Sequence, residues 1–287
     1  MKRIALLLLL FWTALVASAA TKTSKLVLNK GQLLTVDSVL VPYYAFNADT
    51  VFDQTNERIK MAVGDTLNLT VVNHTADTQQ FIIEDFQISQ TIPSGDSIVV
   101  ELVGKQPGVH IYSGGKTGKQ IAYWGASGML VVTSLADANK ATFYWNLKDF
   151  ELNKVLDLDS GKSVDWSTLY PDYFLVNGKG KPQLVGDVAS NVKGSVGQSI
   201  LIMVTNTGKV NHSIHFHGFH ATAVEGKSKR VQKGSIKDTF PIETGDALML
   251  LLVPDKTGIY PVHDHNLIAV AGGGKYPNGV FMIIDIK

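Results

Sequence analysis

The strongest constraint on the fold of this 287-residue chain is a pattern that occurs twice in it. Residues 63–73 (VGDTLNLTVVN) and 196–206 (VGQSILIMVTN) share a Val-Gly start, an apolar run and a final asparagine, 133 residues apart. A second pair, residues 108–112 (GVHIY) and 258–262 (GIYPV), follows in the same order at an offset of 150 residues. Ordered matches at similar offsets predict two copies of one structural unit.

Each copy is predicted to be a β-sandwich. Apolar residues alternate with polar ones or form short runs, and Gly, Asn and Asp interrupt them at short intervals. This pattern is typical of antiparallel sandwiches rather than of helices. We expect an all-β chain with one sandwich at residues 21–139 and a second at residues 140–287, each of ordinary domain size.

Residues 1–20 have the features of a secretory signal peptide. Lys2 and Arg3 precede an apolar run that ends at Val16, and Ala17-Ser-Ala19 provides a small-residue cleavage pattern. The run is shorter than the roughly 20 residues that cross a bilayer, and no later stretch is long and apolar enough to span one. We therefore expect a periplasmic or secreted protein with no membrane span after cleavage.

Charge and cysteine content exclude several functions. Lys and Arg number 26 against 25 Asp and Glu, without a long run of one sign, so no nucleic-acid partner is expected. The absence of cysteine excludes disulfides, iron–sulfur clusters, thiolate metal ligands and thiol nucleophiles. The nucleophile elbow, the Walker loop and the His-Glu-x-x-His motif are also missing, so no catalytic residue is assigned.

Six of the eight histidines lie in two short segments of the second half. His215 and His217 are two residues apart, and so are His263 and His265. Residues two apart on a strand point to the same face, so four imidazoles converge if the two strands are neighbours. Such a set suits copper or zinc, and copper(II) has the higher intrinsic affinity. These four histidines are the predicted metal ligands, with copper favoured over zinc.

The other four histidines carry weaker expectations. His212 and His220 flank the first pair at odd separations, so each is expected either as an additional ligand or as a group that orients the ligands. His74 and His110 are isolated in the first half and are expected at the surface or in turns.

The histidine segments resemble the copper-binding motifs of multicopper oxidases and copper nitrite reductases. Residues 212–218 (HSIHFHG) resemble the His-Pro-x-His-Leu-His-Gly motif of the oxidases' last domain. Residues 258–268 (GIYPVHDHNLI) resemble both the oxidases' His-Cys-His strand and the reductases' Asn-His-Asn-Leu-Ile, whose histidine binds copper across a trimer interface. The resemblance implies two tandem cupredoxin-like Greek-key β-sandwiches, bound copper, and assembly as a homotrimer.

Departures from the family patterns restrict the expected chemistry. Asp264 stands where the oxidases have the cysteine of type 1 copper, and a blue type 1 centre requires that thiolate. In the first half, Ile82, Glu84 and Ser113 stand where the second half has three of its paired histidines. The resemblance therefore implies a degenerate first domain without metal ligands. A trinuclear cluster, which needs eight histidines from two domains, is not expected either.

Three functions remain open. The favoured one is a copper-dependent oxidoreductase without type 1 copper, whose type 2-like centre exchanges electrons with a small-molecule substrate or a soluble donor. A non-catalytic periplasmic copper carrier or reservoir is the alternative, and it fits the missing electron-entry site. The third is a structural metal that joins two sheets or subunits, which complete coordination would favour.

Overall fold

The computed structural model describes residues 20–114, 116–117 and 119–287. The predicted leader therefore lies outside the described residues except for Ala20. The regular secondary structure of the described chain is almost all β-strand, with one short α-helix, α1 (Leu152–Asp159), and a few single turns of 3-10 helix. The all-β prediction is confirmed. None of the described helices is long and apolar enough to cross a bilayer.

The first half of the chain forms two sheets, which we name I and II. Sheet I has the order β2-β1-β4-β7 and sheet II the order β3-β11-β8-β5-β6. The strands span β1 Thr21–Leu34, β2 Leu40–Asn47, β3 Ile59–Ala62, β4 Thr66–Asn73, β5 Gln79–Ile83, β6 Ile88–Ile92, β7 Ser97–Val103, β8 Gly108–Gly114 and β11 Ser127–Thr133. Two short strands, β9 (Lys116–Thr117) and β10 (Lys119–Gln120), form a separate hairpin.

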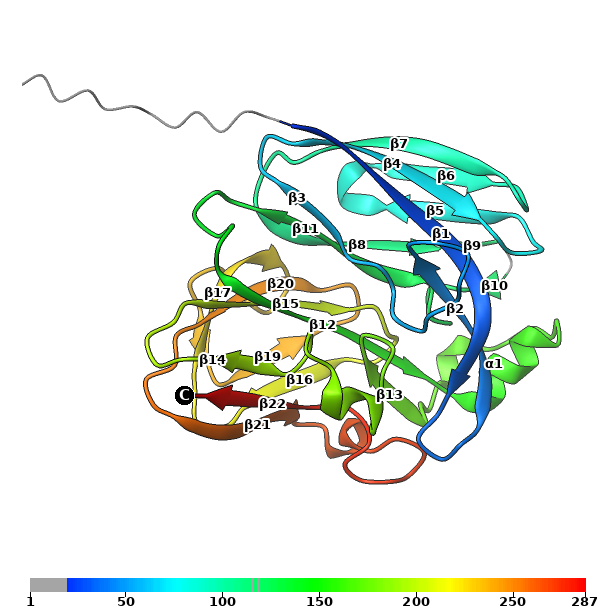
Figure 1. The fold of residues 1–287 in the computed structure, drawn as a ribbon. Helices are drawn as coiled ribbons and strands as arrows, with labels where there is room; N and C mark the ends of the chain where they lie inside the picture. Colours follow the sequence, from blue (N-terminus) through cyan, green and yellow to red (C-terminus); the bar gives the residue numbers. More distant parts are fainter. Residues whose placement is uncertain (1–19, 115, 118) are drawn as a thin grey trace, which may run out of the picture.

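The second half forms sheets III and IV. Sheet III has the order β13-β12-β15-β20-β17-β18, and sheet IV the order β14-β22-β21-β16-β19. The strands span β12 Ala141–Phe150, β13 Tyr173–Val176, β14 Val192–Gly194, β15 Ile200–Asn206, β16 His212–Phe216, β17 Ala221–Lys227, β18 Ile236–Lys237, β19 Thr239–Ile242, β20 Ala247–Leu252, β21 Gly258–Asp264 and β22 Phe281–Ile286. In Figure 1 sheets I to IV follow one another broadly from top to bottom.

The sheet orders confirm the predicted repeat. The order β2-β1-β4-β7 recurs as β13-β12-β15-β20, and β3-β11-β8-β5-β6 recurs as β14-β22-β21-β16-β19. One expectation needs correction, because the sheets are mixed rather than purely antiparallel. Each contains one parallel pair: β1–β4, β3–β11, β12–β15 and β14–β22. These parallel neighbours are distant in sequence, so alternating apolar patterns in single strands cannot reveal them.

A layer of apolar side chains lies between sheets II and III. Val109, Met129 and Val131 of the first half pack against Leu201 and Met203 of the second. The outer face of sheet II is thereby covered by sheet III, and the corresponding outer face of sheet IV points away from it. That exposed face carries the histidine pairs.

Candidate metal centre

The two histidine segments lie on neighbouring antiparallel strands of sheet IV. In the β16–β21 register His215 lies directly opposite His263, and Ile214 lies opposite Asp264. Ile214 and Phe216 are buried in the core, whereas His215 is half-buried, so His215 points to the outer face. The same alternation on β21 buries Val262 and directs His263 outward. The pairing of the strands thus brings both histidine segments together on one face.

The four predicted ligands form a cluster of rings. The ring centroid of His215 lies 4.8 Å from that of His217, 5.8 Å from that of His263 and 5.6 Å from that of His265. The rings of His217 and His263 are 5.0 Å apart, and their Nε2 atoms are separated by 2.9 Å. We name these four residues the histidine cluster.

Hydrogen bonds indicate which ring nitrogens of the cluster are protonated. His263 Nδ1 donates to the Asp264 carbonyl at 2.8 Å, which leaves its Nε2 as a hydrogen-bond acceptor. His217 Nε2 therefore donates to His263 Nε2. His215 Nδ1 makes a hydrogen bond of 2.8 Å with the Thr239 hydroxyl, so the Thr239 contact involves Nδ1 and not Nε2. Partners on Nδ1 of this kind set the ring orientation of metal-binding histidines.

The surroundings of His217 favour its neutral form. Partial burial, followed by the charges of His215 and His263, lowers the pKa of His217. A neutral imidazole is the form that binds a metal ion. Within the described ranges, however, no group of three or more His, Asp or Glu side chains is already arranged to hold one metal ion. The rings are close, but His217 and His263 point their Nε2 atoms at each other. Ring rotation would have to accompany metal binding.

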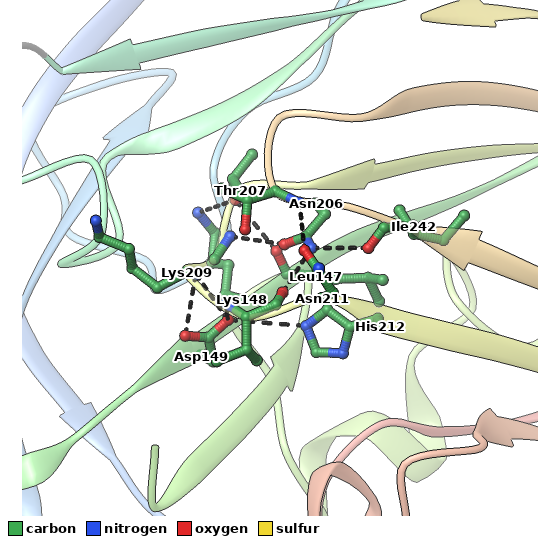
Figure 2. A network of polar contacts seen from close by, with 12 residues as sticks. Leu147, Lys148, Asp149, Asn206, Thr207, Lys209, Asn211, His212 and Ile242 are labelled. Atoms are coloured by element: carbon green, nitrogen blue, oxygen red, sulfur yellow. Dashed lines mark hydrogen bonds and ion pairs between the residues drawn. The ribbon is translucent and has the colours of Figure 1, made fainter. Parts of the chain in front are cut away.

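His212 lies on the opposite face of β16, in the core. Its ring is buried between two carboxylates: Nδ1 bonds Asp264 Oδ2 at 2.5 Å, and Nε2 lies 3.7 Å from Asp149 Oδ2. The longer separation is an ion-pair distance and not a hydrogen bond, and Nε2 has no hydrogen-bond partner. Figure 2 shows Asp149 on β12 facing His212. The structure therefore separates His212 from the histidine cluster and links it to the cluster through Asp264.

The two carboxylates determine the charge of His212. Burial alone would lower the pKa of His212, but hydrogen bonding and the charges of Asp149 and Asp264 outweigh it and raise the pKa to about 9. His212 is thus an imidazolium at neutral pH. Asp264 Oδ1 also accepts the backbone N–H groups of Ser213 and Asn266, at 3.0 and 2.9 Å. Asp264 thereby ties the start of β16 to the loop that carries His265.

The remaining histidines lie apart from the cluster. His220 is exposed beyond the turn at Gly218, where φ is +75°. His74 Nδ1 bonds the Asn29 side chain, and His110 Nδ1 bonds Asp85. None of the three makes a ring contact with the histidine cluster among the described residues.

The first half repeats the strand register without the histidines. In the β5–β8 pair, Ile82 lies opposite Ser113, as His215 lies opposite His263 in the second half. Glu84 follows in a 3-10 turn. Ile82, Glu84 and Ser113 line a cavity of about 200 Å³ that Thr207 and Gly245 of the second half close from the other side. In the first half this position therefore faces the other unit, whereas the histidine cluster faces outward.

Sequence reasoning missed two buried charges on β12. Lys148 and Asp149 are both buried on β12, although Lys and Asp are seldom fully buried. Lys148 Nζ donates to the carbonyls of Gly125 and Ser127 at 3.0 and 2.8 Å, so it joins the two halves. Figure 2 shows Lys148 and Asp149 side by side. The signal was a Lys-Asp pair inside the apolar run of residues 143–150 (FYWNLKDF).

Comparisons with known proteins agree with this architecture. Residues 146–274 match the family model described as multicopper oxidase. Among solved structures, a blue copper oxidase from Nitrosomonas europaea is 18% identical with a TM-score of 0.78, covering 93% of this chain and 86% of that one. A copper nitrite reductase from the same organism is 17% identical with a TM-score of 0.68, covering 93% of this chain and 94% of the reductase.

A laccase from Botrytis aclada is also similar, with 15% identity and a TM-score of 0.70, covering 93% of this chain and 53% of the laccase. No curated protein sequence matches the chain. At these identities the structural likeness establishes the fold, and the predicted cupredoxin-like sandwiches are confirmed. The resemblance is confirmed as well: the chain has the fold of multicopper oxidases and copper nitrite reductases, its second half matches the multicopper oxidase family, and it lacks the cysteine that type 1 copper requires.

Proposed function

We propose that this chain is a copper-binding protein of the multicopper oxidase type, with one type 2-like copper held by His215, His217, His263 and His265. The observation that carries the proposal is the cross-strand pair His215–His263. Each member of this pair has a second histidine two residues along the chain, and all four rings lie on one face of sheet IV.

The donor set fits copper. Four imidazoles in one place suit copper and zinc, and copper(II) is the stronger binder of the two. His263 Nε2 presents a lone pair, and the lowered pKa of His217 favours the neutral, metal-binding form of that ring. A copper held by these four histidines would supply one-electron redox chemistry at this surface.

The surroundings favour direct exchange of electrons with a small molecule or a soluble donor. A chain without cysteine cannot form the type 1 centre through which the oxidases deliver electrons. The side chains of His217 and His265 are exposed, so a reactant can reach the cluster without passing through the protein. The exposure of these two side chains supports an oxidoreductase role over storage. No catalytic residue beyond the ligands is proposed.

Export and assembly belong to the same proposal. The leader pattern of residues 1–20 supports a periplasmic or secreted protein. The outward position of the cluster on sheet IV is compatible with a homotrimer in which a second subunit approaches the copper.

Copper binding is tested by metal analysis and electron paramagnetic resonance of the copper-loaded mature chain. We expect one copper per chain with a type 2 signal, and zinc should compete less well than copper. The double variant His215→Ala/His265→Ala should lose the signal and weaken binding by at least about 100-fold, because half of the imidazole ligands are removed.

The matched control is His74→Ala/His220→Ala, which also removes two histidines but leaves the cluster intact. It should retain one copper and the same spectrum. Equal copper binding in both double variants would contradict the site. If the site is fully occupied but reductants and oxidants do not change the redox state of the bound copper, a carrier is favoured over an oxidoreductase.

A further inference from the structure

A groove lies on the outer face of sheet IV, next to the histidine cluster. It has a volume of about 240 Å³ and runs along β22 and β21. Its walls include the apolar side chains of Val185, Ile259, Phe281 and Ile283. Val185 is 65% exposed and Ile259 is 70% exposed, so apolar surface here remains in contact with water. For comparison, a cavity of about 150 Å³ holds benzene. The groove has room for a compound with one ring and a substituent.

Phe281 is the wall that the groove shares with the histidine cluster. It lies opposite His263 in the β21–β22 register, and the two rings are stacked at 6.1 Å with an angle of 11° between their planes. The opposite neighbour of His263 across the sheet is His215. A molecule in the groove is therefore one aromatic ring away from the cluster.

The groove has an unbalanced positive charge at the Phe281 end. Lys181 Nζ lies 4.5 Å from the centroid of the Phe281 ring. In the described part of the chain no carboxylate pairs with Lys181, and partial burial lowers the pKa of its ammonium group. The other two charges of the groove, Lys193 and Asp285, have opposite signs, so together they add no net charge to it. The charge left for a ligand is that of Lys181.

We infer that this groove binds a small carboxylate with an apolar body of about one ring, its acid group at Lys181 and its body against Ile259 and Ile283. The carboxylate would give Lys181 the counter-charge that it lacks, and the body would cover exposed apolar surface. Neutralising the charge of Lys181 and burying apolar surface both favour binding in the groove. The binding of this ligand to the groove is independent of the proposed function. The further claim that the bound ligand reacts at the copper centre rests on the proposed function.

Binding is tested first on the copper-free mature chain, with benzoate as the probe and ¹⁵N chemical shifts as the readout. We expect shifts that saturate and that map to β22, β21 and Lys181. Lys181→Gln should weaken benzoate binding by about 10-fold, since a charge-assisted contact is lost. The matched control Lys229→Gln, at an exposed lysine outside the groove, should leave it unchanged. Neutral benzyl alcohol should bind Lys181→Gln and wild type equally.

A second variant acts on the apolar wall. Ile259 is largely exposed, so Ile259→Asp should fold normally and should repel benzoate from the groove. Benzoate binding that is the same in wild type, Lys181→Gln and Ile259→Asp would overturn the inference. Benzoate-induced shifts confined to another surface would overturn it too. So would groove shifts that follow the protein concentration and not the benzoate concentration, because a second copy of the chain would then be the occupant.

The copper-loaded protein separates this inference from the proposed function. Paramagnetic relaxation of the benzoate protons should appear on copper loading and should disappear in His215→Ala/His265→Ala. If benzoate binding depends on Lys181 but the chain takes up no copper, the inference about the groove is supported and the proposed copper centre is contradicted. Copper binding without benzoate binding would do the reverse.

Discussion

Replacing His212 with Gln should lower the free energy of unfolding by about 3–5 kcal/mol, the range found when one partner of a buried ion pair is removed. The His212 ring is inaccessible to solvent and lies between Asp149 and Asp264, which are also inaccessible. A glutamine offers an amide donor but no charge. The two buried carboxylates would then have no cation between them, although each keeps a backbone N–H partner, that of Lys209 for Asp149 and that of Ser213 for Asp264.

The measurement is urea unfolding at pH 6.5 of wild type, His212→Gln and His220→Gln. The exposed His220 provides the control, and its variant should stay within about 0.5 kcal/mol of wild type. A His212→Gln variant as stable as the control would show that the buried imidazolium contributes nothing net, in which case the three-residue network is not a stabilising feature.

The loss caused by His212→Gln should also depend on pH. The pKa of His212 is raised from 6.5 to about 9 in the folded chain, so its contribution is fully present below pH 6.5 and is lost as pH rises through 9. The difference between wild type and variant should therefore shrink between pH 6.5 and pH 9.5. A difference that is constant over this range would contradict the charged state of His212.

Lys148 should give the opposite pH dependence, and this is the second large effect. Burial lowers the pKa of Lys148 from 10.5 to about 7, although the charge of Asp149 opposes the shift. Between pH 7 and 10.5 the unfolded chain binds this proton and the folded chain does not, so stability rises with pH. The rise attributable to Lys148 over that window is about 3–5 kcal/mol.

Lys148→Met should remove this rise and leave the fall caused by His212. The free energy of unfolding of wild type should change little between pH 7 and pH 9, because the two residues titrate in opposite directions. That of Lys148→Met should decrease over the same range, and that of His212→Gln should increase. Urea unfolding at three pH values checks all three slopes, with Lys229→Met as the exposed control. Parallel slopes in wild type and both core variants would contradict the two assigned charge states.

Lys148 also makes the contact between halves a polar one. Its Nζ reaches Gly125 and Ser127 of the first half as well as the Thr207 hydroxyl, at 3.1 Å, in the second. Thr207 and Ser127 line the cavity between the halves. A change in the ionisation of Lys148 therefore acts at the junction of sheets II and III, on the side of sheet III away from the histidine cluster.

The sequence by itself determined the secondary structure, the repeat and the pairing of the ligand candidates. Strand patterns and turn residues depend on near neighbours, so short windows contain them. The His-x-His spacing places both histidines of each pair on one face of a strand whatever the rest of the fold is. The missing cysteine excludes type 1 copper in any fold, since the thiolate is a chemical requirement.

Only the tertiary structure decided which residues meet across strands. It placed His215 opposite His263, and it separated His212, three residues away from His215, into the core with Asp149 and Asp264. It also brought Lys181 against Phe281, although the two are 100 residues apart. These contacts depend on strand order and register, which are set by packing over the whole chain. A linear pattern records which face a residue takes but not its neighbour on the next strand.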